Sequence, residues 1–307
     1  MSLAAEITRQ GPTEPDDRPA AAGAGPAEPP LTVIEPRPGW HFLDLGEMWR
    51  YRELLFFLAW RDVMVRYKQT ALGAAWAVLQ PFATMVVFSL FFSKLNDAPA
   101  GAAGASLKVP YPLFVFAGLL PWTFFATAIV SAGNSVVGCQ QLVTKVYFPR
   151  LLIPLGAVGA ALVDFAIAFA MLLVIMLYYW VLPGWGFLWL PLLALGLLAA
   201  AVGVGTWLAA LTVTYRDFRF VIPFMVQLWM FATPSIYVQP DRVISPTLQS
   251  FLPLNPAYGL ILNFRLAILG RPLDLYPLAM SLAVSLLLLL AGCLCFRRAE
   301  RGFADVI

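Results

Sequence analysis

The stretch NSVVGCQQLVTKVYFPRLLIP (residues 134–154) is a polar segment between two apolar runs, each long enough to cross a bilayer. Prolines punctuate its end, at Pro149 and Pro154. We therefore expect a polar helix and turn between two membrane spans, on the side that collects positive charge. Two interpretations fit: a docking element for a soluble partner, or an ordinary basic loop that only sets topology. The residues that suggest docking are Gln140, Gln141, Lys145 and Arg150.

The composition is that of a membrane protein. Of 307 residues, 61% are hydrophobic and only 12% are charged, which is too apolar for a soluble domain. Long uncharged stretches predict an all-α membrane protein with six spans, some of which contain prolines. The approximate spans are residues 74–92, 113–131, 151–180, 187–213, 220–238 and 275–296.

The segments outside the spans differ in composition. Residues 1–38 are rich in Pro, Ala and Gly, which predicts a disordered tail that stays attached because it lacks the apolar core of a signal peptide. Residues 39–70 mix aromatic and charged side chains, which predicts an amphipathic helix in the headgroup plane; a soluble juxtamembrane helix is the alternative. Residues 71–296 form the membrane domain, and 297–307 form a short C-terminal tail.

The distribution of basic residues predicts the orientation. With a cytoplasmic N-terminus, fifteen of the twenty Lys and Arg residues fall on the cytoplasmic side: eight before the first span, and seven in later loops and the C-terminal end. Because cytoplasmic loops carry the excess of Lys and Arg, both termini are predicted to be cytoplasmic.

One segment on the opposite side, between residues 238 and 275, is apolar but too short to cross. Asn255 and Pro256 suit the N-cap and the first position of a helix that continues through AYGLILNFRLAILG. We expect a short re-entrant or interfacial helix before the last span.

No catalytic or metal site is predicted. The chain contains no GxxxxGK[ST] phosphate loop, no HExxH and no GxSxG motif, and its three cysteines have no metal-ligand spacing. Asp164 is the only acidic residue deep in a span, which marks it as a functional candidate. The alternative, which we favour, is an Asp that faces the other helices and bonds to a neighbouring hydroxyl or amide.

Basic and aromatic residues near the spans suggest a route for cargo. Arg61, Arg66 and Lys68 stand just before the first span, where a lipid diphosphate would sit; attraction to anionic lipids explains them equally well. Most aromatic residues are expected in interfacial belts or in packing, and some could line a conduit and stack on sugar rings. The candidates for a channel or gate are Trp76, Phe82, Phe224, Trp229, Phe231 and Tyr237.

Six motifs, in order, give the chain a specific resemblance. They are WRDVMVRYKQTALGAAWAVLQP (60–81), YPLFVFAGLLPWTFF (111–125), LVTKVYFPRLLIPL (142–155), YRDFRFVIPFMVQLWMFATPSIY (215–237), LNPAYGL (254–260) and FRRAERGFADVI (296–307). From about Trp40 onward the chain resembles the permease subunit of type-2 ABC exporters for polysaccharides, the group that serves O-antigen, teichoic acid and capsule export.

The resemblance implies partners and roles. It implies a homodimer joined to two copies of a separate ATP-binding subunit, which binds ATP and Mg, so that this chain holds no cofactor and is not an enzyme. The cargo would be polysaccharide on undecaprenyl diphosphate, most specifically O-antigen, crossing a bacterial cytoplasmic membrane; other membrane lipids are contacts, and no nucleic acid is expected. The loop that includes Tyr147 and Phe148 would be the coupling helix, and residues 40–60 the interface helix. The first and fifth spans would form a lateral gate, and the segment after Val238 would hold short periplasmic helices.

Two alternatives to this function remain. A type-2 ABC exporter of teichoic acid, capsule, a drug or another lipid would share the fold and the partner but not the cargo. A membrane-embedded glycan-modifying enzyme would change the glycan without ATP.

Overall fold

The computed structural model describes residues 45–68, 70, 73–96, 110–145, 148–233, 249–300 and 302. Across these ranges the chain is helical and contains no strand, which confirms the all-α prediction for them. The predicted tail, residues 1–38, lies outside the described residues, as do Tyr147 and Tyr237.

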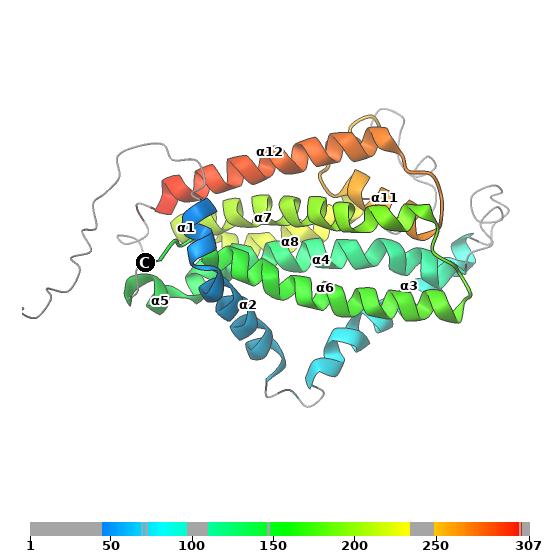
Figure 1. Ribbon diagram of the computed structural model, residues 1–307, viewed down its shortest axis with the longest axis horizontal. Helices are drawn as coiled ribbons and strands as arrows, with labels where there is room; N and C mark the ends of the chain where they lie inside the picture. Colours follow the sequence, from blue (N-terminus) through cyan, green and yellow to red (C-terminus); the bar gives the residue numbers. More distant parts are fainter. Residues whose placement is uncertain are drawn as a thin grey trace, which may run out of the picture. The chain divides into compact units, whose positions relative to one another are not determined.

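The helices follow the predicted order along the chain (Figure 1). They are α1 Leu45–Arg50, α2 Arg52–Tyr67, η1 Gly73–Ala75, α3 Trp76–Asn96, α4 Tyr111–Gly138, α5 Gln140–Lys145, α6 Leu152–Tyr178, η2 Trp185–Trp189, α7 Leu190–Thr214, α8 Phe218–Ala232, η3 Leu252–Leu254, α11 Tyr258–Ile268 and α12 Leu275–Glu300.

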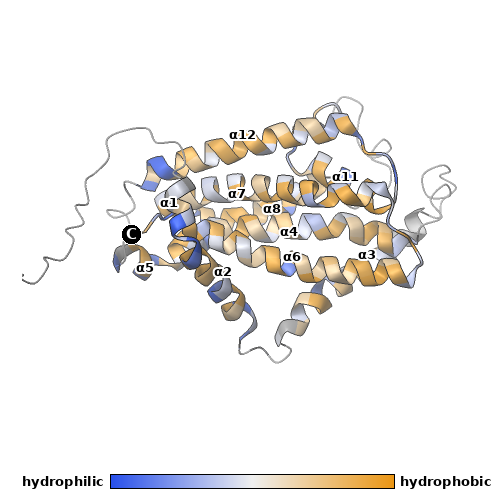
Figure 2. Cartoon of the chain, in the orientation of Figure 1, coloured by the Kyte–Doolittle hydropathy of each residue, from blue (hydrophilic) through white to orange (hydrophobic). Residues whose placement is uncertain are grey.

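Each predicted span overlaps a helix, and the end of the fifth, residues 234–238, lies outside the described residues. By length and composition, four helical stretches among the described residues are able to cross a membrane: α4, α6, η2 with α7 (Trp185–Thr214), and α12. The apolar parts of α3 and α8 are shorter, Trp76–Phe91 and Phe218–Ala232, so the count of six spans remains a prediction. Figure 2 shows apolar residues along these helices and hydrophilic ones on α1, on α2 and at the end of α12. The chain is thus a multi-pass membrane protein.

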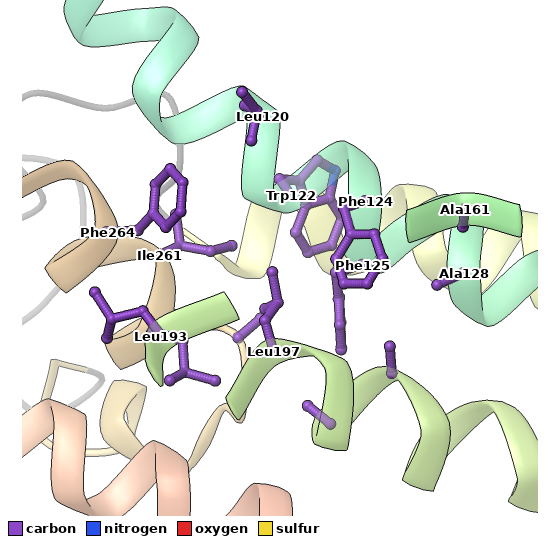
Figure 3. Close-up of a cluster of buried hydrophobic side chains, with 14 of the residues drawn as sticks. Leu120, Trp122, Phe124, Phe125, Ala128, Ala161, Leu193, Leu197, Ile261 and Phe264 are labelled. Atoms are coloured by element: carbon purple, nitrogen blue, oxygen red, sulfur yellow. The ribbon is translucent and has the colours of Figure 1, made fainter. Parts of the chain in front are cut away.

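Helix α4 lies at the centre of the helices. Its residues from Leu113 to Trp122 are all buried, and it packs against α3, α6, α7, α8 and α11. A helix that is apolar on every side is covered either by other helices or by lipid, and this part of α4 is covered by other helices. Its aromatic side chains Trp122, Phe124 and Phe125 meet Leu193 and Leu197 of α7 in the buried cluster of Figure 3.

Helices α7 and α12 approach each other closely at two glycines. A Cβ added at Gly203 would lie 2.5 Å from backbone atoms of Leu288 and Leu289, and one added at Gly292 would overlap the Gly203 carbonyl oxygen. Small residues allow such contact between helices in a membrane, where dispersion contacts replace the hydrophobic driving force.

Helices α1 and α2, which are separated at Tyr51, correspond to the predicted amphipathic segment. Helix α2 packs on α6: Leu58 is buried there, and a Cβ added at Gly156 would lie 2.9 Å from the Leu58 Cβ. Other apolar side chains of α2 are exposed, among them Phe56, whose ring stacks on Trp60. One side of α2 therefore faces the helices, and an aromatic side faces the surroundings.

Helix α11 is the predicted short helix before α12, and its start differs from the prediction. It begins at Tyr258 with Ala257 at the N-cap position, not directly after Asn255. The Asn255 side chain instead closes the preceding turn, where its Oδ1 accepts a hydrogen bond from the Ala257 backbone nitrogen (3.1 Å). The helix is held by Asn263, whose Nδ2 donates to the Asp274 carbonyl (3.0 Å) and whose Oδ1 accepts from the Asp274 nitrogen (2.8 Å).

The α7–α12 contact predicts a sharp effect of one methyl group. Gly203→Ala should lower the free energy of unfolding by about 1–3 kcal/mol, because the added Cβ overlaps backbone that has no rotamer to change. Gly138→Ala is the matched control, since nothing lies within 4 Å of its added Cβ. Thermal unfolding of the purified variants in detergent measures both. Equal melting temperatures would contradict the close contact.

Candidate functional site

The polar loop between α4 and α6 contains the short helix α5 and reverses the chain. Helix α4 ends at Gly138, α5 covers Gln140–Lys145, and Pro149 precedes the first turn of α6. Proline disfavours helix at the residue before it, so it separates α5 from α6. The side chains of Gln140, Gln141 and Lys145 are exposed. This part of the loop presents amide and positive groups outward.

The other described residues predicted for this loop point inward. Phe148 is only 5% exposed and packs in an apolar cluster with Leu58, Val143 and Phe296. Arg150 is bound to the end of α12: its backbone nitrogen donates to Glu300 Oε1 (3.2 Å), and its Nη1 donates to the Glu300 carbonyl (2.9 Å). These two residues attach the loop to the helices.

A second polar site joins α2, α4 and α6 around Asp164. The Asp164 Oδ2 forms an ion pair with Nη1 of Arg66, and Tyr67 Oη donates a hydrogen bond to Asp164 Oδ1 (2.5 Å). Arg66 Nη2 also donates to Ser131 Oγ on α4 at 3.5 Å. We favoured a hydrogen bond from a neighbouring hydroxyl or amide to Asp164, and the Tyr67 hydroxyl makes such a bond. Sequence analysis did not identify Arg66 as the second partner. Arg66 lies 98 residues away in sequence, and no spacing pattern links the two.

The chemistry of this site explains why Asp164 is tolerated in α6. A carboxylate at membrane depth is costly unless it is paired. Burial raises the pKa of the Tyr67 phenol above its usual 10.0, and the nearby Arg66 opposes that shift. At neutral pH Tyr67 is therefore protonated and serves as the donor to Asp164.

The three basic residues predicted to act together are placed differently. Arg61 Nη2 donates to Asp62 Oδ1 (2.8 Å) and to Cys139 Sγ (3.0 Å), at the end of α4. Arg66 reaches Asp164, and Lys68 is exposed just after α2. Five residues along a helix correspond to a rotation of about 140°, so Arg61 and Arg66 point to different neighbours.

The aromatic candidates also divide. In the single chain, Trp76 and Phe82 on α3 and Phe224 and Phe231 on α8 are exposed. Trp229 is half-buried instead, edge-on to Phe125 with ring centroids 5.2 Å apart.

The Trp229 indole is also part of a polar contact that the sequence did not indicate. Its Nε1 donates to Asn255 Oδ1 (3.1 Å), and Asn255 Nδ2 donates to Thr233 Oγ1 (2.7 Å). These bonds connect α8 and the turn that follows it to the turn before α11.

Arg265 on α11 is a buried cation that sequence analysis did not single out. It is 5% exposed, and its guanidinium carbon lies 4.3 Å from the centroid of the Phe114 ring. Burial lowers its pKa to about 10, although Tyr111 and Tyr258 raise it, so it stays charged at neutral pH. A cation against an aromatic face is the stabilising arrangement here.

Comparison with known proteins identifies the family. The model of the "ABC-2 type transporter" family matches residues 53–269, which include every helix from α3 to α11. The chain belongs to the ABC-2 type transporter family. The resemblance inferred from the six motifs is thereby confirmed.

Individual relatives cover most of the chain. It is 30% identical over 263 residues to the O-antigen export system permease protein RfbA of Myxococcus xanthus. The matched region covers 85% of this chain and 98% of that protein. A Klebsiella pneumoniae protein of the same name is 24% identical over 257 residues, 83% of this chain and 95% of its own. The polysialic acid transport protein KpsM of Escherichia coli is 24% identical over 75% of this chain and 88% of its own.

The described part of the chain holds no group of three His, Cys, Asp or Glu residues arranged to bind a metal ion. Three polar sites described above are the α5 loop, the Asp164 site and the Asn255 contact. Each joins helices that are distant in sequence.

Substitution of the buried and of the exposed residues of the α5 loop should affect stability differently. Phe148→Ala should lower the free energy of unfolding by about 3 kcal/mol, because it empties a buried aromatic site. Lys145→Ala is the control in the same loop, and its effect should stay within about 0.5 kcal/mol because the side chain is exposed. Thermal unfolding in detergent separates them; a stable Phe148→Ala variant would refute the inward placement.

Proposed function

We propose that this chain is the transmembrane subunit of an ABC exporter that carries O-antigen polysaccharide, linked to undecaprenyl diphosphate, across the bacterial cytoplasmic membrane. The observation that carries the proposal is the match to an O-antigen export permease over 98% of that relative's length. The likeness to a polysialic acid transport protein favours capsular polysaccharide as the second candidate cargo.

The energy comes from a separate ATP-binding subunit that docks on the α5 loop and binds ATP and Mg. Exposed Gln140, Gln141 and Lys145 suit a polar protein surface. Phe148 and Arg150 fix the loop to α2, α6 and α12, so that force on the loop reaches the membrane helices through these contacts. In this proposal Tyr147, which is not described, contributes to the same docking surface.

The topology has six spans with both termini in the cytoplasm. The Arg150–Glu300 contact puts the end of α12 beside the α5 loop, and Met48 of α1 packs against the cluster that contains Phe148. These neighbours agree with the positive-inside bias of the sequence. The spans α3 and α8 complete the six.

Two copies of this subunit form the transporter with two ATP-binding subunits. Exposed aromatic residues on α3 and α8, including Phe82 and Phe224, give large apolar faces for a second copy, for lipid or for the cargo. A lateral gate between these helices admits the lipid diphosphate. Arg66 and Lys68 supply positive charge at this gate, which attracts the diphosphate. Trp229 belongs to the attachment of α8 to Asn255 more than to a channel wall.

The proposal is tested by removing the gene from its host. The deletion strain should lose surface polysaccharide and accumulate it on undecaprenyl diphosphate inside the cell, and the wild-type gene should restore export. Surface polysaccharide that persists without this chain would overturn the proposal. Conversion of the glycan by the purified chain without ATP would favour the enzyme alternative.

Docking through α5 predicts loss of coupling. Lys145→Ala combined with Gln141→Ala should lower export severalfold while the complex still hydrolyses ATP, because hydrolysis no longer drives the spans. Arg271→Ala is the control, because it also removes one positive charge but lies just before the N-terminal end of α12, away from the α5 loop. Transport and ATPase rates in proteoliposomes measure the ratio. A ratio equal to that of the wild type would return α5 to the role of an ordinary loop.

A further inference from the structure

The ion pair between Arg66 and Asp164 lies at the C-terminal end of α2. Both side chains are partly open, with 33% of Arg66 and 23% of Asp164 exposed. Among the described residues, only Asp164 and Ser131 accept hydrogen bonds from Arg66. A guanidinium has five N–H donors, so Arg66 retains donors and an open side for another anion.

We propose that Asp164 is a built-in competitor that occupies Arg66 until the diphosphate of the lipid-linked substrate takes its place. This inference rests on the proposed function, because it requires a diphosphate cargo. A diphosphate carries more negative charge and more acceptor oxygens than a carboxylate, and it matches the planar fork of an arginine. Arg66 therefore exchanges one anionic partner for a stronger one.

Tyr67 makes the exchange possible. A carboxylate left alone at this depth would be strongly disfavoured. After Arg66 turns to the diphosphate, Asp164 still accepts a hydrogen bond from the neutral Tyr67 phenol, now 2.5 Å away. Two adjacent residues of α2 thus hold Asp164, one with a charged donor and one with a neutral donor, and the arriving anion competes for only the charged one.

The exchange also loosens the attachment of one end of α2. The contact of Leu58 with Gly156 holds α2 on α6 by packing that no anion disturbs. The Arg66–Asp164 pair is a charged attachment at the end of α2, and its loss leaves the last turn of α2 held on Asp164 by Tyr67 alone. A ligand moves a conformational equilibrium only by binding the two states differently, and here the difference is the broken ion pair.

The experiment measures binding of farnesyl diphosphate to the complete complex with its ATP-binding subunit in nanodiscs. Asp164→Asn should bind about fivefold more tightly than the wild type, which is the order of one partly exposed ion pair. Tyr67→Phe should bind about fivefold more weakly, since Asp164 then depends on Arg66 alone. Asp217→Asn removes the same charge from an exposed turn and should change nothing.

The double variant gives the decisive comparison. Arg66→Gln should lose most binding, and Arg66→Gln with Asp164→Asn should bind no better, because competition needs the arginine. Wild-type complex that does not bind farnesyl diphosphate would refute the diphosphate cargo itself. If wild type binds and Arg66→Gln does not, but Asp164→Asn is unchanged or weaker, only the competition is wrong. Should Asp164→Asn fail to assemble, unchanged or tighter binding by Tyr67→Phe would overturn the inference.

Discussion

Helices surrounded by hydrocarbon gain little from burying apolar side chains against each other, so their arrangement depends on close backbone contact and on polar pairs. This constraint accounts for the main contacts of the chain. Gly203 and Gly292 let α7 and α12 meet at backbone distance, and Gly156 does the same for α6 with Leu58 of α2. The Arg66–Asp164 pair adds a polar attachment where α2 ends. The helix at the centre, α4, is held because its neighbours are positioned by such contacts.

In the polar loops, some side chains fix the loop to the helices and others face outward. In the α5 loop, Phe148 is buried while Lys145 is exposed three residues earlier. At the Asn255 turn, one amide binds both the Trp229 indole and the Thr233 hydroxyl, so the turn is fixed on the α8 side before α11 begins. Polar residues in these loops therefore define geometry as much as chemistry.

Sequence reasoning located the helices because apolar length is a local property. The stretches ending near Ser131 and Trp180 correspond to α4 and α6, and prolines such as Pro121 and Pro223 lie inside helices as expected. The direction in which individual side chains point was less predictable. Polarity marked Arg150 for an outer surface, whereas its contact with Glu300 is set by a helix 150 residues away. The partner of Asp164 could not be predicted for the same reason, since several basic residues are available to pair with one carboxylate.

The contact between Arg150 and Glu300 has a consequence for the order in which the protein is assembled. The two residues are 150 positions apart, so the α5 loop is translated well before the helix that binds it. The loop gains this contact only after α12 has been made and has packed beside it. Any change that delays the insertion of α12 would therefore leave the α5 loop unattached for longer.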